Sequence, residues 1–100
     1  MVDFARPRFH LGQVVATPGA LEVIAQGGHS PAEFLDRHVR GDWGRLSAGD
    51  RQLNEEALKD GSRILSAYRT RTCSKIWIIT EAADDRGQRA ATTILLPDEY

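Results

Sequence analysis

Apolar residues recur at helical spacing in the first half of the chain. Leu21 and Ile24 share one face of a segment that follows Thr17. Threonine at the N-cap followed by Pro18 is a typical helix start. Gly27 and a second glycine come next, and glycine readily adopts the left-handed backbone that ends helices. The pattern predicts a first helix from Pro18 to the residue before Gly27.

A second helix is predicted from Pro31 to about Arg40. Ser30 stands at its N-cap and Glu33 at its third position, the spacing at which the two side chains close a capping box. Its inner stripe is expected to contain Phe34, Leu35, His38 and Val39. The helix should therefore bury one face that includes a histidine.

A third helix is predicted to start at Ser47, with Asp50 at its third position, and to end at Gly61. Its buried side is expected to hold Leu53, Ala57 and Leu58. Helices are thus expected to occupy most of the first half of the chain.

After Gly61 the period changes from helical to extended. Three segments rich in β-branched and aromatic residues are predicted strands, namely Arg63–Thr70, Lys75–Glu81 and Ala91–Leu96. The middle segment is apolar at both alternations, so it is predicted to be the central strand with both faces covered. Trp77 is therefore expected to lie buried under the helices.

The fold class predicted from this order is α+β. The connections over 70–74 and 82–90 suit neighbouring strands that run antiparallel. We expect about three helices from the N-terminal half, packed on a three-stranded antiparallel sheet formed mainly by the C-terminal half. Val14–Ala16 is a candidate fourth strand at the edge of that sheet.

A length of 100 residues suits one domain. Residues 1–10 show no period and are predicted to be a flexible N-terminal arm, and residues 11–100 a single domain. The 13 basic and 14 acidic residues nearly cancel, which excludes a strongly basic protein of the kind that coats duplex nucleic acid. A single cysteine and the lack of a membrane span predict a cytoplasmic protein.

Metal and cofactor sites are not predicted. The candidate metal ligands His10, His29, His38 and Cys73 stand singly, without the short spacing of a zinc site. No glycine-rich phosphate loop and no nucleophile elbow occur in the sequence. We therefore expect no cofactor and no bound metal.

Two positions have both a structural and a functional interpretation. His38 is either a half-buried histidine bonded to a carbonyl or a general base. Trp43, in the turn from Gly41 to Gly44 with Asp42 beside it, is either a lid over the core or an anchor for a partner. The structural interpretation is favoured at both positions.

Basic residues gather at the ends of the predicted strands, namely Arg63, Arg69, Arg71, Lys75, Arg86 and Arg89. Such a patch suits contact with phosphate or with an acidic surface. Its alternative role is to keep the strand ends solvated and to discourage edge-to-edge pairing. Glu81, near the patch, has the chemistry of a general acid or base.

Four blocks of the sequence together resemble one protein family. They are Leu11–Leu21, Arg37-His38 with Gly41–Gly44, Lys75–Glu81 and Thr92–Tyr100. The family consists of small proteins carried on bacterial plasmids and integrated elements, usually labelled plasmid-related proteins. The resemblance implies a mobile genetic element as the setting and no particular activity.

Some members of that family are labelled type I restriction modification subunits, a label that this sequence does not support. A chain of 100 residues is too short for a methyltransferase domain. Neither a glycine-rich cofactor loop nor an Asn-Pro-Pro-aromatic catalytic motif is present.

Two hypotheses for function remain. In the first, the chain is a non-enzymatic accessory protein that binds a host or element-encoded protein, most concretely as an anti-restriction or anti-CRISPR inhibitor of a nucleoprotein defence complex. Its expected contact residues are Trp43, Asp42, Arg69, Arg71, Arg86 and Arg89. A homodimer is compatible with this hypothesis.

The second hypothesis is a small metal-independent ribonuclease or toxin, with the layout of barnase and RelE-type toxins. Cations would stabilise the phosphate of RNA, and a base would activate the 2′-hydroxyl. The candidate catalytic residues are His38, Arg63, Arg69, Lys75 and Glu81. The first hypothesis is preferred, because the spacing of residues identifies no base–nucleophile pair.

Overall fold

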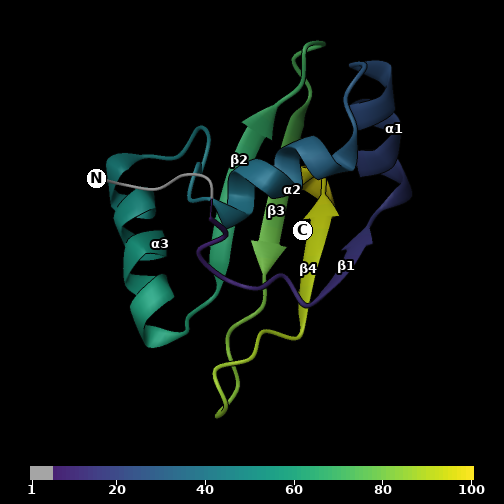
Figure 1. The fold of residues 1–100 in the computed structure, drawn as a ribbon. Helices are drawn as coiled ribbons and strands as arrows, with labels where there is room; N and C mark the ends of the chain where they lie inside the picture. The colour runs from purple at the N-terminus through teal and green to yellow at the C-terminus, as the bar shows by residue number, and fades with distance from the viewer. Residues whose placement is uncertain (1–5) are drawn as a thin grey trace.

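The computed structural model describes residues 6–100. In chain order its elements are β1 (Gln13–Ala16), α1 (Pro18–Gln26), α2 (Pro31–Val39), α3 (Ala48–Asp60), β2 (Ile64–Arg69), β3 (Lys75–Thr80), β4 (Ala91–Leu95) and the 3-10 helix η1 (Pro97–Glu99) (Figure 1). The predicted three helices and three later strands are confirmed, and the fold class is α+β. No helix in the described part of the chain is long and apolar enough to cross a membrane.

The four strands form one mixed sheet in the order β1-β4-β3-β2. The neighbours β2, β3 and β4 are antiparallel, as their connections predict. β1 is the predicted edge strand, but it pairs with β4 in parallel, from Gln13 opposite Ala91 to Ala16 opposite Ile94. The expectation of a wholly antiparallel sheet is therefore wrong. A short connection makes neighbouring strands reverse direction, whereas three helices and two strands separate β1 from β4 along the chain.

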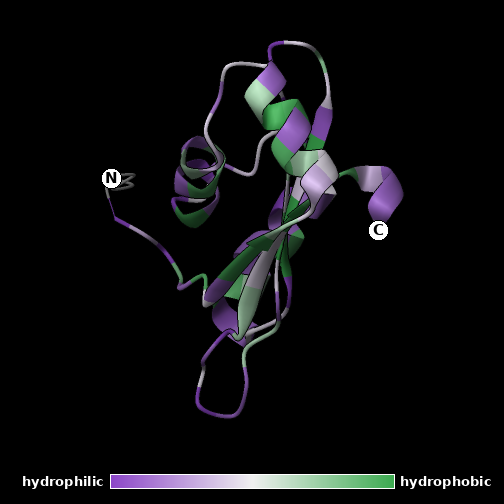
Figure 2. Ribbon diagram, turned by 90° about the vertical axis from the view of Figure 1, so that its right-hand side faces the viewer, coloured by the Kyte–Doolittle hydropathy of each residue, from purple (hydrophilic) through white to green (hydrophobic). Residues whose placement is uncertain are grey.

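Helices cover only one face of the sheet. α1 and α2 lie on one side of it, and the short η1 lies on the other (Figure 2). On the covered face, Ile78 and Ile94 are buried and pack with Ile24 of α1 and Phe34 of α2. Trp77, which has the opposite alternation in β3, is only partly buried.

The prediction that Trp77 lies under the helices is thus wrong, as is the prediction that both faces of β3 are covered. Successive side chains of a strand point to opposite faces, and the helices pack on the face that holds Ile78. The ring of Trp77 instead contacts the ring of Tyr100, with centroids 5.8 Å apart. The second face of the sheet therefore carries this aromatic pair and the short η1, and neither α1 nor α2 covers it.

The predicted starts of α1 and α3 are confirmed together with their capping bonds. Thr17 Oγ1 accepts from the backbone N–H of Ala20, and Ser47 Oγ accepts from that of Asp50, both at 3.1 Å. α2 also begins at the predicted residue, but Ser30 makes no side-chain capping bond.

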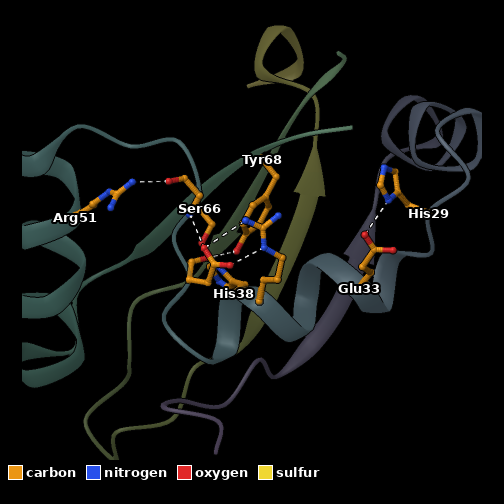
Figure 3. Close-up of polar contacts among 9 residues, drawn as sticks. His29, Glu33, His38, Arg51, Ser66 and Tyr68 are labelled. Atoms are coloured by element: carbon orange, nitrogen blue, oxygen red, sulfur yellow. Dashed lines mark hydrogen bonds and ion pairs between the residues drawn. The ribbon is translucent and has the colours of Figure 1, made fainter. Parts of the chain in front are cut away.

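The predicted capping box of α2 is wrong because Glu33 is engaged elsewhere. Its carboxylate lies 2.8 Å from Nδ1 of His29 (Figure 3). The same imidazole packs edge-on against Phe34, with ring centroids 4.9 Å apart. A partner one turn earlier therefore draws the carboxylate away from the backbone of Ser30.

The buried face of α3 also differs from the prediction. Leu53 is 62% exposed, whereas Asn54 and Ala57 are buried. Asn54 faces β2 because its side-chain amide pairs with the backbone of Leu65. A polar side chain that satisfies two backbone groups therefore takes the inner position expected for leucine.

The predicted flexible arm is in part folded onto the helices. Arg8 donates its backbone N–H to the end of α2 at 2.6 Å, and its guanidinium binds Glu55. The ring of Phe9 packs against His38 and Trp43. Arg8 and Phe9 therefore belong to the folded body, and residues 1–5 of the predicted arm lie outside the described residues.

Candidate functional site

Two adjoining hollows form a groove, here called the basic groove, where β2 turns into β3. Their volumes are about 570 Å³ and about 320 Å³, and Arg45, Tyr68 and Arg69 line both. Other lining residues include Arg37, Asp42, Gly44, Lys75 and Trp77. Arginine and lysine side chains outnumber the one acidic residue in this lining, so the groove is electropositive.

The turn before α3 places Arg45 beside β2. Ala67 donates its N–H to the carbonyl of Trp43 at 3.1 Å, and Arg45 donates its N–H to the carbonyl of Ala67 at 2.7 Å. Gly44, between these two contacts, has a φ of +75°, and a Cβ there would collide with the Ala67 carbonyl oxygen. Glycine is therefore required where this turn lies along the sheet edge.

Arg37, Asp42 and Tyr68 form a rigid wall of the basic groove. Arg37 Nε donates to Asp42 Oδ2 at 2.7 Å, and the guanidinium carbon lies 4.5 Å from the centre of the Tyr68 ring. The Tyr68 hydroxyl donates to the backbone carbonyl of Asp42 at 2.6 Å. The hydrogen bond from Arg37 lowers the pKa of Asp42, and burial raises the pKa of Tyr68. Asp42 is therefore an ionised carboxylate whose charge Arg37 already balances.

Three further cations at the basic groove are free to meet a ligand. The side chains of Arg45, Arg69 and Lys75 are exposed and make no hydrogen bond or ion pair with any residue of the described range 6–100. Arg69 lies directly opposite Lys75 in the β2–β3 pairing, and the second hollow joins both to Arg45. Like charges held this close together attract an anionic ligand.

The basic patch expected from the sequence is divided between the two ends of the sheet. The hairpin end holds Arg69, Arg71 and Lys75. The opposite end holds Arg63, Arg86 and Arg89. The patch is therefore two separate surfaces, and only the first adjoins the basic groove.

Two of the expected contact residues, Arg71 and Arg89, make hydrogen bonds within the protein. Arg89 is 9% exposed, and its guanidinium donates to three backbone carbonyls, including that of Ala57 at 3.0 Å. Arg71 donates to the carbonyl of Gly27 at 3.1 Å. Arg89 is therefore buried and bound to the backbone, whereas Arg71 and Arg86 remain exposed.

Trp43 is a core residue, which corrects the expectation that it anchors a partner. It is 5% exposed, stacks on Phe9 with centroids 6.2 Å apart and donates its indole N–H to Glu55 at 2.9 Å. The favoured interpretation, a lid over the core, agrees with these contacts. Asp42 beside it is exposed, but Arg37 holds its carboxylate.

His38 lies in a buried network of hydroxyl groups. Its Nδ1 is 2.5 Å from Ser66 Oγ (Figure 3), and its Nε2 is 2.8 Å from Thr80 Oγ1. The side chain is 0% exposed, and desolvation, with a smaller effect of the Arg89 charge, lowers its pKa to about 3. His38 is thus a hydrogen-bonded histidine of the fold, as the favoured interpretation predicts, but it is fully buried where half-burial was expected, and its partners are hydroxyls and not a carbonyl.

The candidate ribonuclease residues do not converge on one site. His38 has no access to solvent. Lys75 and Glu81 lie at opposite ends of β3, about 20 Å apart at 3.3 Å a residue. Arg63 is bound to the hydroxyl of Tyr100. Of that set only Arg69 and Lys75 line the basic groove, and the carboxylate among its described lining residues, Asp42, is bound by Arg37.

Arg37, Arg45 and Tyr68 are groove residues that the sequence reasoning missed. They come from α2, from the turn that follows it and from β2, and only folding brings them together. In the sequence, the two glycines Gly41 and Gly44 could have indicated that this turn lies against another segment, since such glycines often mark a close approach of two backbones.

Within residues 6–100, no three histidine, cysteine or carboxylate side chains gather as a metal site. Comparisons with protein-family models, with curated proteins and with solved structures find no match to this chain. Its function is therefore to be inferred from its own residues.

Proposed function

We propose that this protein is a non-enzymatic accessory protein of a mobile genetic element, which binds an acidic surface of a host or element-encoded protein through the basic groove. The observation that carries the proposal is the trio Arg45, Arg69 and Lys75, three cations without partners among the described residues. Complementary charge across an interface speeds association and selects the partner. In its most concrete form, the partner belongs to restriction or CRISPR machinery and the bound protein inhibits it.

The charge and size of the basic groove favour a protein partner over a nucleic acid. The whole chain carries a formal charge of −1, whereas proteins that follow a phosphate backbone carry a basic face or stripe. Three free cations suit a short cluster of carboxylates. Trp77 lines the same groove, is partly exposed and supplies aromatic surface of the kind enriched at protein interfaces.

The surroundings of the basic groove favour binding over catalysis. A ribonuclease needs a base within reach of the 2′-hydroxyl. Among the described lining residues the carboxylate is that of Asp42, and it accepts a hydrogen bond from the guanidinium of Arg37. The histidine expected for that role, His38, is buried and neutral.

The mobile-element setting is supported by the four sequence blocks that resemble plasmid-related proteins. Elements that enter a new cell meet its defence systems, and a small binding domain can block such a system by occupying a surface. A counter-defence role therefore accounts for both the mobile-element setting and the basic groove.

Plasmid transfer into cells that carry a restriction or CRISPR system tests the proposal. Expression of the protein in the recipient should raise the recovery of unmodified or targeted plasmid. The double substitution Arg45→Glu with Arg69→Glu should abolish this protection, because it reverses two of the three free charges. Arg86→Glu is the matched control, since Arg86 is exposed at the opposite end of the sheet.

Three outcomes would contradict the proposal. Protection that is absent from a panel of both defence types would remove the counter-defence role. Equal loss of protection in Arg86→Glu would show that the basic groove is not the contact surface. Growth arrest on expression, with RNA cleavage by the purified protein, would favour the ribonuclease.

A further inference from the structure

The two edges of the sheet differ in whether their backbone groups are satisfied. At the β2 edge, the Asn54 side chain donates to the carbonyl of Leu65 at 2.6 Å and accepts from its N–H at 3.1 Å. Further along the same edge, Ala67 exchanges hydrogen bonds with Trp43 and Arg45. The β2 edge is therefore closed by the protein itself at Leu65 and Ala67.

The β1 edge is open. Gln13 donates its N–H to Ala90 and Thr17 donates its N–H to Ile94, both at 3.0 Å, so these residues face β4. Because neighbours in a strand point in opposite directions, the N–H and C=O groups of Val14 and Ala16 face away from the sheet. In Figure 1, β1 is the outermost strand, and no element of the described chain runs along its outer side.

The surface around this edge is apolar and uncharged. No charged residue occurs from Leu11 to Leu21. Among the described residues, five large apolar side chains are exposed, and three of them lie in this stretch: Val14 at 41%, Val15 at 42% and Leu21 at 44%. Edge strands of monomeric proteins are usually protected by charges, prolines or bulges. β1 is short, with four residues, but it contains no charged residue and no proline.

We propose that β1 pairs with β1 of a second copy of this chain, antiparallel across a twofold axis, so that two sheets join into one of eight strands. The β1 edge has no charged side chain that could pair with the acidic surface proposed as the partner of the basic groove. It is complementary to itself, because each copy presents the same outward donors and acceptors. This inference rests on the proposed function only in excluding the acidic partner, and its crosslinking and mass measurements do not depend on that function.

The register of the pair follows from the flanking residues. With the axis at Val15, Val14 of each copy lies opposite Ala16 of the other, and the two pairs form four hydrogen bonds. A register centred on Val14 would pair Ala16 with Gly12, whose φ of +65° is not extended. A register centred on Ala16 would pair Val14 with Pro18, which has no N–H. Only the register centred on Val15 uses both outward residues of β1.

Disulfide trapping tests this register directly. Val15 and its symmetry mate form a non-hydrogen-bonded pair with Cα atoms about 4.5 Å apart, within the range of disulfides. Val15→Cys, in a Cys73→Asn background that removes the native thiol, should give a covalent dimer on mild oxidation. Val14→Cys in the same background should not form the disulfide, because the two Val14 residues are not opposite each other. Each lies opposite Ala16 of the other copy. Leu53→Cys is the control for an exposed thiol on a distant surface.

The mass of the protein in solution gives the second measurement. The mass of the wild type should rise toward that of a dimer as concentration increases. Val15→Lys should raise the dissociation constant about tenfold or more, because two ammonium groups would meet at the axis. Leu53→Lys, which adds the same charge on α3, should leave the constant unchanged.

Any one of three results would overturn the proposal. The first is a wild type that stays monomeric at every concentration, and the second is Val14→Cys that crosslinks as fast as Val15→Cys. The third is a wild type that is monomeric while the Val15→Lys variant, but not the Leu53→Lys variant, loses plasmid protection. That result would mean that the β1 edge pairs with a strand of another protein.

Discussion

Thr92 determines which ring nitrogen of His38 carries the proton, and it does so through Thr80. Thr92 donates its only hydroxyl proton to the carbonyl of Leu11 at 2.7 Å. It therefore accepts from Thr80 at 2.8 Å, and Thr80 accepts from Nε2 of His38. Nδ1 is left to accept from the hydroxyl of Ser66. The whole network is thus satisfied by a neutral imidazole.

This network predicts that the fold loses stability in mild acid. The pKa of His38 is about 3 in the folded state, against 6.5 in the unfolded chain. Between these values the unfolded state binds a proton that the folded state does not. The free energy of unfolding should therefore fall as the pH falls below about 6.5, by up to about 1.4 kcal/mol for each pH unit. Urea denaturation at a series of pH values measures the slope.

The His38→Gln variant separates this titration from that of the other acid-sensitive groups. It has no titrating side chain at this position, so its stability should depend less on pH than that of the wild type. His10→Gln is the control for replacing a histidine, because His10 is exposed and lies outside the buried hydroxyl network. An equal slope in His38→Gln and the wild type would contradict the prediction.

The two serine caps should respond differently to alanine. Ser47 accepts from the N–H of Asp50, so Ser47→Ala should lower the free energy of unfolding by about 1 kcal/mol. Ser30 makes no capping bond, so Ser30→Ala should cost less than about 0.5 kcal/mol. Thermal denaturation of both variants checks this order, and a larger loss for Ser30→Ala would show that its hydroxyl does cap α2.

Neighbouring residues of β3 should differ in their contribution to stability. Ile78 is 0% exposed under the helices, so Ile78→Ala should cost about 2–5 kcal/mol. Trp77 is only partly buried and packs on Tyr100, so Trp77→Ala should cost about 1–2 kcal/mol. Denaturant titration measures both losses. A greater loss for the tryptophan variant would mean that the second face of the sheet is covered.

Two glycines with the same backbone conformation should tolerate alanine to different extents. Gly44 and Gly87 have φ values of +75° and +76°, but a Cβ would collide with Ala67 only at Gly44. Gly87→Ala should cost about 1 kcal/mol for the left-handed conformation alone. Gly44→Ala should lower the free energy of unfolding by more than about 2 kcal/mol. It should also change the lining of the basic groove, since it displaces Arg45 from β2. Equal losses of stability would show that the turn does not depend on this close approach.

The sequence by itself determined the elements whose causes are local. Thr17 and Ser47 cap their helices through bonds to residues three positions later, and Gly61 ends α3 in the left-handed conformation. The β2–β3 hairpin likewise follows from a short connection. Interactions within a few residues decide these features, so pattern and spacing are sufficient to predict them.

The tertiary structure alone decided which surfaces these elements present. The same alternating pattern places Ile78 under helices and Trp77 on the opposite face, and only the position of α1 and α2 distinguishes the two. Asn54 replaces Leu53 on the inner side of α3 because an unsatisfied strand edge lies beside it. The basic groove, the parallel edge strand and the buried network of His38 likewise join residues far apart in the chain. The free energy of such contacts depends on three-dimensional packing, which periodicity along one chain does not encode.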